Sequence, residues 1–337
     1  MRVAVTGGLG FIGSNFVRHM LGKHPGCSII NIDKLTYAGN PANLRGLERS
    51  PRYKWARADV ADTSAMRRLL KGADAVVHFA AETHVDRSIL GAAEFVRTNV
   101  LGTQVLLDAA RACGVSRFVH VGTDEVYGSV PRGKSRESDN LLPNSPYAAS
   151  KAAADLVARS YFRTYGFPVI ITRCSNNFGP CQYPEKALPL LVTNALEDRR
   201  FPLYGDGRQM RDWLYVQDHV LALDLVLRRG RPGEIYNIGA GAPITNLELV
   251  SKVLKLMGKP SSLITRVPDR PGHDRRYALD CSKIRRELGW KPVYEFERAL
   301  RLSVEWYAHN REWWEPLKRH TAYKQYCARQ YGAKKEN

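Results

Sequence analysis

The sequence predicts an α/β fold: a doubly wound parallel sheet followed by a smaller C-terminal α/β substrate domain. In the first half of the chain, short apolar runs bounded by turn residues alternate with runs of helical spacing. A glycine-rich turn follows the first apolar run, and an acidic residue ends the second. Together these features are typical of sheets that bind a dinucleotide at the carboxyl ends of their strands.

The first strand is expected at residues 3–6, followed by a glycine-rich turn at 7–13 and a helix over 14–21. Glycines there allow a tight turn and a close approach to a pyrophosphate, which lies at the helix N-terminus. A second strand at 28–32 ends in Asp33, whose carboxylate would accept hydrogen bonds from ribose hydroxyls and repel a 2′-phosphate. We therefore predict a Rossmann-type domain that prefers NAD to NADP.

The third and fourth strands are predicted at residues 53–58 and 75–79. The pair Asp59-Val60 that follows suits the adenine edge, and the pair Ala80-Ala81 is small enough for a cofactor to lie close. Apolar positions at helical spacing over 94–113, among them Val96, Val100, Leu101, Val105 and Ala109, predict a stripe that faces the core or a subunit interface.

The fifth strand, at residues 117–122, is buried and parallel by its apolar pattern, and Thr123, Asp124 and Glu125 follow it directly. The carboxyl ends of such strands are where ligands bind. Adjacent residues of a regular strand face opposite sides. Both carboxyls can therefore serve one site only if the backbone leaves strand geometry at Thr123.

Tyr147 and Lys151 open the next helix four residues apart, so they share one of its faces. An ammonium one turn away favours the tyrosinate, and we expect Lys151 to lower the pKa of Tyr147 enough for it to act as a base. A sixth strand at 168–173 follows this helix. Beyond it the pattern changes to short mixed segments and a basic loop at 266–277.

Three parts are predicted along the 337 residues: an NAD-binding domain over 1–175, to which segments near 212–240 return, a nucleotide-sugar domain over 176–331, and a disordered tail over 332–337. No apolar run is long enough to span a bilayer and no signal core follows Met1, so a cytoplasmic location is expected. The six cysteines form no ligand pattern, and neither a metal site nor a disulfide framework is predicted.

The net charge of +18 is unusual. Basic residues alternate with aromatic ones over 298–337, a composition that suits either single-stranded nucleic acid or amphipathic helices that cap a domain. We favour capping helices, and we interpret the charge as attraction of an anionic nucleotide sugar rather than of nucleic acid.

Several motifs together resemble the extended short-chain dehydrogenase/reductase superfamily and, within it, the dTDP-glucose 4,6-dehydratases, over nearly the whole chain. The motifs are Thr6-Gly-Gly-Leu-Gly-Phe-Ile-Gly13, Ala80-Ala-Glu-Thr83-His-Val-Asp86-Arg-Ser88, Thr123-Asp-Glu125, Tyr147-Ala-Ala-Ser-Lys151, Asn176-Asn177-Phe-Gly-Pro180, Arg211-Asp-Trp-Leu-Tyr215 and Arg270-Pro-Gly-His273-Asp274. The Thr-Asp-Glu segment is the discriminating one, because the related 4-epimerases lack this carboxylate pair. One position departs from the family pattern: Thr83 stands where Ser is usual, which keeps the hydroxyl but adds a methyl group.

The resemblance implies conversion of dTDP-glucose to dTDP-4-keto-6-deoxyglucose by C4 oxidation, loss of water across C5 and C6, and hydride return to C6, in deoxysugar biosynthesis. Tyr147 with Lys151 would be the base at the 4-hydroxyl, Glu125 the base at C5, Asp124 the acid at the C6 hydroxyl, and Thr123 a partner of the 4-oxygen. The implied NAD-binding residues are Gly7, Gly10, Phe11, Ile12, Gly13, Asp33, Lys34, Thr36, Asp59, Val60, Ala80, Ala81, Thr98, Tyr147, Lys151 and Asn177. The implied substrate-binding residues are Thr83, Thr123, Asn176, Lys186, Tyr204, Arg211, Asn246, Arg270 and His273.

The resemblance also implies a homodimer through the helices near 94–113 and 147–165. Alternatives are a nucleotide-sugar 4-epimerase, a dehydratase of UDP- or GDP-sugars, and a non-enzymatic scaffold with a basic RNA-binding surface. His84 could act as a general base, but we expect a hydrogen-bonded structural residue.

Overall fold

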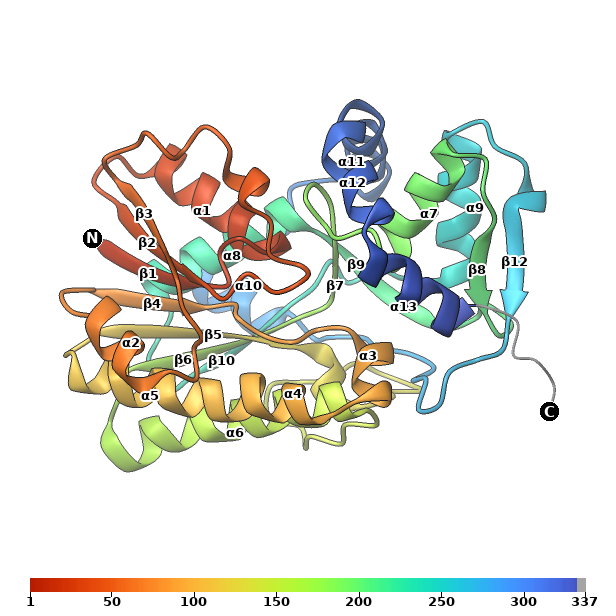
Figure 1. The fold of residues 1–337 in the computed structure, drawn as a ribbon. Coiled ribbons are helices and arrows are strands. Elements are labelled where there is room, and N and C mark those ends of the chain that lie inside the picture. Colours follow the sequence, from red (N-terminus) through yellow and green to blue (C-terminus); the bar gives the residue numbers. More distant parts are fainter. Residues whose placement is uncertain (332–337) are drawn as a thin grey trace.

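A seven-stranded sheet organises the chain in the computed structural model, which describes residues 1–331 (Figure 1). The strands lie in the order β10-β6-β5-β4-β1-β2-β3, and every neighbouring pair is parallel. They are β1 (Arg2–Thr6), β2 (Ser28–Asp33), β3 (Tyr53–Arg57), β4 (Ala75–His78), β5 (Arg117–Thr123), β6 (Val169–Cys174) and β10 (Ile235–Ile238). The chain winds outward from β1 to β3 and then returns to β4, so the predicted fold class is confirmed. The tail predicted over 332–337 lies outside the described residues.

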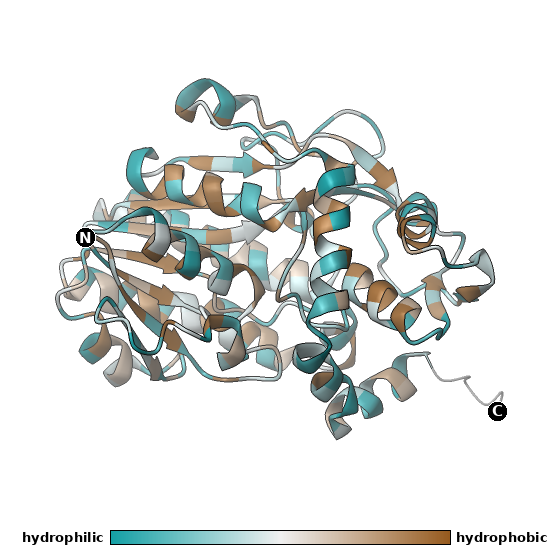
Figure 2. Cartoon of the chain, turned by 90° about the horizontal axis from the view of Figure 1, so that it is seen from above, coloured by the Kyte–Doolittle hydropathy of each residue, from teal (hydrophilic) through white to brown (hydrophobic). Residues whose placement is uncertain are grey.

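Helices cover both faces of this sheet (Figure 1). One face carries α2 (Thr63–Leu69), α5 (Gly102–Ala112) and α6 (Pro146–Tyr165), and the other carries α1 (Phe11–Lys23), α8 (Val216–Arg229) and α10 (Ser282–Leu288). The alternation along β1 explains the two layers: Val3 and Val5 pack on the α1 side, whereas Ala4 between them packs on the α5 side. Figure 2 shows hydrophobic residues along these strands and along the helices that pack beside them.

The segment predicted as one apolar stripe consists of three helical pieces, α4 (Ala93–Phe95), the π-helix η2 (Val96–Leu101) and α5. Val105 is buried in the core, whereas Val96 and Leu101 are 53% and 48% exposed. The buried part of the predicted stripe faces the core, and the prediction of a subunit interface for the exposed part stays a prediction. A π-helical turn closes over more residues than an α-helical turn, so the apolar positions before and after it fall on different sides.

Parts of the chain beyond β6 build a second region at the right of Figure 1, whereas α8, β10 and α10 return to the first sheet. This second region contains the sheet β11-β9-β7 and the parallel pair β12-β8. These strands are β7 (Asn176–Phe178), β8 (Phe201–Tyr204), β9 (Met210–Tyr215), β11 (Pro243–Thr245) and β12 (Ile264–Val267). Its helices are α7 (Ala187–Leu196), α9 (Asn246–Leu256), α11 (Phe296–His309), α12 (Arg311–Arg319) and α13 (Thr321–Tyr331), and the remaining short helices of the chain are η1 (Pro41–Leu44), α3 (Val85–Leu90), η3 (Asp124–Tyr127) and η4 (Ser261–Leu263).

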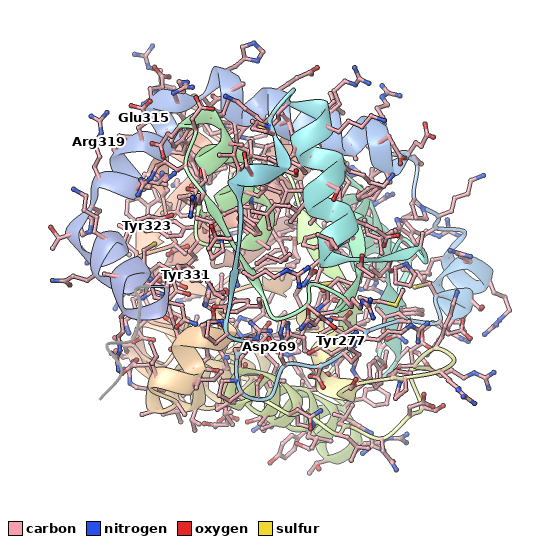
Figure 3. All side chains as sticks on the ribbon, turned by 90° about the vertical axis from the view of Figure 1, so that its right-hand side faces the viewer. Asp269, Tyr277, Glu315, Arg319, Tyr323 and Tyr331 are labelled. Carbon is pink, nitrogen blue, oxygen red and sulfur yellow. The ribbon has the colours of Figure 1, made fainter. Side chains whose placement is uncertain are left out.

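The C-terminal helices bury several aromatic side chains and expose many of their charged ones, although Lys318 is buried and pairs with Glu197 at 2.6 Å. Trp314, Tyr323 and Tyr326 are buried. Glu315 and Arg319 lie at the outer surface and form an ion pair of 2.9 Å (Figure 3). The buried rings of α12 and α13 thus pack against the protein, as in the capping arrangement favoured from the sequence, and are not free to stack on bases.

A buried carboxylate joins α8 to α1 on the face of the sheet that these helices cover. Asp224 of α8 lies 2.9 Å from Nε2 of both His19 and His24, and Arg228 Nε donates to it at 2.7 Å. These contacts hold α8 against α1, and the chain then continues into β10 at the sheet edge. The predicted domain boundary at residue 175 stays a prediction.

Candidate active site

Two adjoining cavities open at the carboxyl ends of the parallel strands. The first has a volume of about 290 Å³ and the second about 170 Å³. They share the lining residues Thr83, Glu125, Asn176, Glu185 and Lys186. A ligand in the first cavity can therefore touch a ligand in the second.

The glycine turn forms one wall of the first cavity without side chains. Gly7 has φ +70°, and a Cβ there would lie 2.6 Å from the amide nitrogen of Ala80. A Cβ on Gly13 would lie 2.8 Å from Gly8 Cα and collide with the carbonyl oxygen of Gly7. Only glycine fits these two positions, and the turn leads directly into α1, whose N-terminus faces the same cavity. This cradle fits the pyrophosphate of a dinucleotide.

Asp33 lies at the end of β2 and lines the first cavity. Its two carboxylate oxygens accept hydrogen bonds from the amides of Leu9 (3.0 Å) and Leu35 (2.9 Å), which fix the orientation of the group. Burial raises the pKa of Asp33 above its usual range, while these two amides oppose that shift. The carboxylate keeps further lone pairs for ribose hydroxyls, so the residues present fit NAD.

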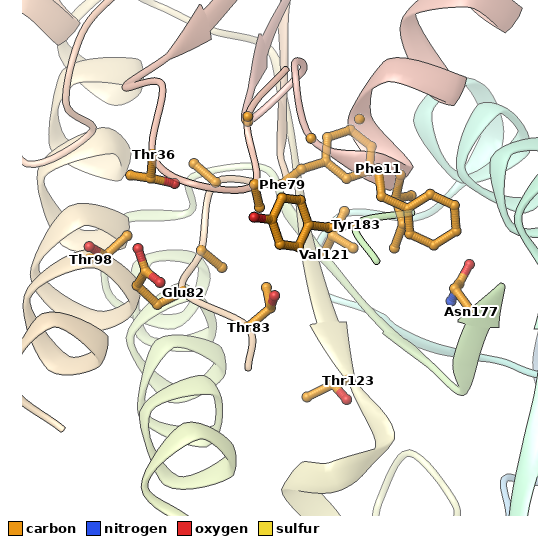
Figure 4. Close-up of a pocket in the computed structure, with 18 of the residues that line it drawn as sticks. Phe11, Thr36, Phe79, Glu82, Thr83, Thr98, Val121, Thr123, Asn177 and Tyr183 are labelled. Atoms are coloured by element: carbon orange, nitrogen blue, oxygen red, sulfur yellow. The ribbon is translucent and has the colours of Figure 1, made fainter. Parts of the chain in front are cut away.

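All the residues predicted for the cofactor line this cavity. Figure 4 shows Thr36 and Thr98 on one side, Asn177 on the other, and Thr123 at the end of β5. Asp59 is held between Lys34 (2.9 Å) and Arg97 (2.8 Å), a pairing that the sequence did not indicate. The lining residues of the predicted set are Gly7, Gly10, Phe11, Ile12, Gly13, Asp33, Lys34, Thr36, Asp59, Val60, Ala80, Ala81, Thr98, Tyr147, Lys151 and Asn177.

The backbone leaves strand geometry after Thr123, as the placement of two neighbouring carboxyls requires. β5 ends at Thr123 and the 3₁₀-helix η3 begins at Asp124. Thr123 Oγ1 accepts a hydrogen bond from the amide of Glu125 at 3.3 Å and so caps this helix. Asp124 and Glu125 consequently both line the first cavity, together with Tyr147.

The two carboxyls lie in different surroundings. Burial, and then the neighbouring charge of Glu125, raise the pKa of Asp124 well above its usual range. Its Oδ2 has no hydrogen-bond partner among residues 1–331. Burial also raises the pKa of Glu125, but the positive charges of Arg270, Arg211 and Lys186 oppose the shift. Asp124 is thus the better proton donor of the pair and Glu125 the better base.

The expectation that Lys151 lowers the pKa of Tyr147 is wrong for this structure. Lys151 Nζ donates a hydrogen bond to the carbonyl oxygen of Val121 at 2.8 Å. Burial raises the pKa of Tyr147 well above its usual value, and the charge of Glu125 raises it further. The rise in the pKa of Tyr147 caused by desolvation exceeds any lowering by Lys151 one helical turn away. A positive charge within the first cavity is therefore needed to favour the tyrosinate.

Charged groups with few partners surround the second cavity. Arg270 Nη1 donates to Asp86 at 2.9 Å, while its Nε is buried without a partner among the described residues. Lys186 Nζ donates to the carbonyl oxygen of Thr83 at 2.8 Å, and Arg211 Nη2 donates to that of Asp274 at 2.9 Å. These guanidinium and ammonium groups retain donors that match phosphate oxygens. Of the predicted substrate residues, Thr123 lines the first cavity, and the second is lined by Thr83, Asn176, Lys186, Tyr204, Arg211, Asn246, Arg270 and His273.

Sequence reasoning missed an ion pair between half-buried Arg87 and Glu185, a buried residue that lines both cavities. Arg87 Nη2 contacts Glu185 at 2.8 Å, and the Arg87 guanidinium also lies 4.0 Å from the centre of the Tyr37 ring. Arg87 falls within a motif that carries the resemblance, but Glu185 lies 98 residues further on, so no local pattern joins them.

His84, expected to be structural, is buried with Nε2 3.4 Å from the hydroxyl of Tyr326. Burial lowers its pKa to about 4, so the ring is neutral at pH 7. All six cysteines are free, and all lie within the described residues. In this part of the chain, no helix has the length and apolar character that a bilayer crossing demands.

Comparisons with known proteins agree with this geometry. A family model described as GDP-mannose 4,6 dehydratase matches residues 4–302. A dTDP-glucose 4,6-dehydratase of Streptomyces niveus is 53% identical over 94% of this chain and 96% of its own length, and one of Streptomyces antibioticus is 53% identical over 96% and 97%. The crystal structure of a dTDP-glucose 4,6-dehydratase from Streptomyces venezuelae with NAD and TYD bound is 55% identical, with a TM-score of 0.93, covering 94% of this chain and 100% of that one.

Proposed function

This chain belongs to the dTDP-glucose 4,6-dehydratase family, and on that premise we propose that it converts dTDP-glucose to dTDP-4-keto-6-deoxyglucose as an NAD-dependent hydro-lyase of deoxysugar biosynthesis. One observation carries this proposal: Asp124 and Glu125 both line the cavity that contains Tyr147. A 4-epimerase needs no such pair.

NAD would be held by the glycine turn and Asp33. It supplies a hydride acceptor when the sugar is oxidised and, in its reduced form, a hydride donor later in the cycle. Tyr147 takes the proton of the sugar 4-hydroxyl, and Thr123 hydrogen-bonds to the 4-oxygen. Lys151, one helical turn from Tyr147, also lines this cavity and donates to the carbonyl oxygen of Val121. These roles, and those of the remaining cofactor residues, are proposals that rest on their places in the cavity.

The carboxyl pair performs the elimination. A 4-ketone acidifies the C5 proton, and Glu125 removes it because its cationic neighbours stabilise its ionised form. Asp124, kept neutral by burial, donates its proton to the C6 hydroxyl so that water leaves. Glu125 then returns its proton to C5 and is ionised again. Asp124 is left ionised, and the cycle closes when it is reprotonated and Tyr147 releases the proton that it took from the 4-hydroxyl.

The second cavity would hold the nucleotide. We propose that Arg211 and Arg270 bind the diphosphate, since a guanidinium matches its oxygens and Arg270 Nε is buried without a partner among the described residues. The remaining predicted substrate residues of this cavity would form the rest of its wall; they are Thr83, Asn176, Lys186, Tyr204, Asn246 and His273.

We also propose a homodimer. Val96 and Leu101 of η2 and Leu156 of α6 are apolar and exposed, and these two helices pack side by side. A second copy would cover them in a four-helix contact. Light scattering should show a dimer for the wild type and a monomer for Leu101→Glu. Leu142→Glu, an exposed apolar position in a loop, is the matched control and should remain dimeric.

We also propose that the protein is located in the cytoplasm, because NAD and nucleotide sugars are charged and do not cross membranes unaided. Cell fractionation checks it: activity found with the membrane pellet or in the medium would contradict it.

Mass spectrometry tests the reaction. dTDP-glucose and UDP-glucose are incubated separately with the protein and NAD in deuterated water. We expect loss of one water and gain of one deuteron at C5 with dTDP-glucose only. Conversion of UDP-glucose instead would change the nucleotide assignment. Recovery of the C4 epimer without mass loss would mean an epimerase and would refute the roles of Asp124 and Glu125.

A further inference from the structure

The last helix of the described chain contributes to the second cavity. Tyr331, the final residue of α13, lines this cavity with Tyr204 and His273. The Tyr204 ring contacts both neighbours, with centroids 6.0 Å from His273 and 6.1 Å from Tyr331. Three rings from separate parts of the chain therefore meet at one end of the cavity.

A chain of hydrogen bonds joins α13 to a cationic group of the same cavity. Gln330 Nε2 donates to the Tyr204 hydroxyl at 2.7 Å, and this hydroxyl donates to Asp86 Oδ2 at 2.8 Å. The other oxygen of Asp86 accepts from Arg270 Nη1 at 2.9 Å. With Gln330 as its donor partner, the Tyr204 hydroxyl directs its own proton to Asp86, and Asp86 in turn holds Arg270.

Further contacts hold α13 in this place. The Tyr323 hydroxyl donates to the carbonyl oxygen of Pro184 at 3.2 Å, and the Tyr326 hydroxyl donates to Asp86 at 3.3 Å. The Arg87 guanidinium lies 4.4 Å from the centre of the Tyr326 ring. Figure 3 shows Tyr323 and Tyr331 along this helix, near the loop that carries Asp269.

We propose that α13 is a wall of the nucleotide site, in which Tyr331 contacts the bound nucleotide and Gln330 positions Tyr204. The inference rests on the proposed function and extends it to two residues that no motif includes. The Tyr331 ring supplies flat apolar area beside a base or ribose. Gln330 touches no ligand itself and acts through the Tyr204, Asp86 and Arg270 chain.

Three variants test the proposal: Tyr331→Ala, Gln330→Ala and the control Lys324→Ala, an exposed position of the same helix. For each we would measure steady-state kinetics with dTDP-glucose, the Kd of dTDP by calorimetry, and the Tm. Tyr331→Ala should raise both KM and the Kd of dTDP about tenfold and leave kcat within about twofold, as loss of an aromatic contact predicts. Gln330→Ala should raise both about fivefold. Lys324→Ala should match the wild type, and Tyr331→Phe, which keeps the ring, should restore most of the affinity.

A KM and a Kd unchanged in both variants, or a lower Tm with unchanged KM, would overturn the proposal, because α13 would then serve stability alone. Loss of kcat with unchanged KM would also overturn it. The outcome is separable from that of the proposed reaction. A wild-type protein that binds dTDP but does not dehydrate dTDP-glucose would refute the reaction, while the Kd comparison would still decide the role of α13.

Discussion

Replacing Asp124 with asparagine separates the proton donor from the base in the proposed elimination. Burial and the charge of Glu125 raise the pKa of Asp124 well above its usual range, which favours the neutral form of its carboxyl. Asparagine is also neutral and nearly the same shape, so the field at Glu125 and Arg211 is preserved. The amide cannot release a proton to the C6 hydroxyl. General acid catalysis contributes about 10²–10⁴-fold, or about 2.7–5.4 kcal/mol, and we expect turnover to fall by this factor.

The assay follows dTDP-glucose in deuterated water by mass spectrometry. Asp124→Asn should form product slowly yet still place deuterium at C5 of the recovered sugar, because Glu125 continues to remove that proton. Glu125→Gln is the matched control and should yield neither product nor C5 deuterium. Wild-type turnover by Asp124→Asn would refute the acid role, and C5 exchange that depends on Asp124 rather than Glu125 would reverse the assignment.

Stability provides an independent measurement on the same variant. A carboxyl with a folded pKa above its unfolded value of about 3.9 binds an extra proton in the native state. The wild-type free energy of unfolding therefore falls as pH rises from about 4 through the folded pKa. The asparagine variant lacks this loss and should become progressively more stable than the wild type above about pH 4 in urea titrations. The opposite trend would mean that Asp124 is ionised in the native protein.

Three further predictions concern the cofactor cradle and the helix contact. Gly13→Ala should weaken NAD binding at least about tenfold by calorimetry, since its Cβ would collide with the glycine turn, whereas Gly22→Ala on the same helix meets nothing within 4 Å and should bind normally. Asp33→Asn should lower the ratio of NAD to NADP affinity, because the charge that repels a 2′-phosphate is gone; an unchanged ratio would place discrimination elsewhere. Asp224→Asn should cost about 3 kcal/mol of stability at pH 7, as expected when one partner of a buried ion pair is removed. Although burial opposes ionisation, hydrogen bonds from His19, Arg228 and His24 hold the pKa of Asp224 well below its usual value. The difference in unfolding free energy between wild type and Asp224→Asn should therefore shrink as pH falls below about 4. A difference that stays constant with pH would contradict the ionic origin of the effect.

The parallel sheet and the dinucleotide cradle could be predicted because their signals are local. A strand, a glycine turn and a helix follow one another over residues 2–23, and Asp33 ends the next strand. The exit from strand geometry at Thr123 was likewise predictable, since two adjacent carboxyls can share one site only in that way. In each case the physics involves neighbours along the chain.

The features that escaped prediction depend on distant partners. The π-helical turn is held where Asn99 donates to Ser150 Oγ at 2.9 Å, a contact that periodicity cannot reveal. Gln330 and Tyr204 are 126 residues apart. The raised pKa of Tyr147 reflects burial by the whole fold, whereas its spacing from Lys151 indicated only a shared helix face.

The π-helical turn also joins the cofactor cavity to the face proposed for a second copy through one short piece of backbone. Thr98 lines the first cavity, while Val96 and Leu101 of the same turn are exposed on the face proposed for a second copy. A dinucleotide in contact with Thr98 would touch the same short main-chain segment that carries both apolar side chains. If cofactor binding and self-association are coupled through this turn, thermodynamic reciprocity requires that each raise the affinity of the other by the same factor. In such a dimer, NAD would bind more tightly as protein concentration rises, and removal of NAD would favour dissociation.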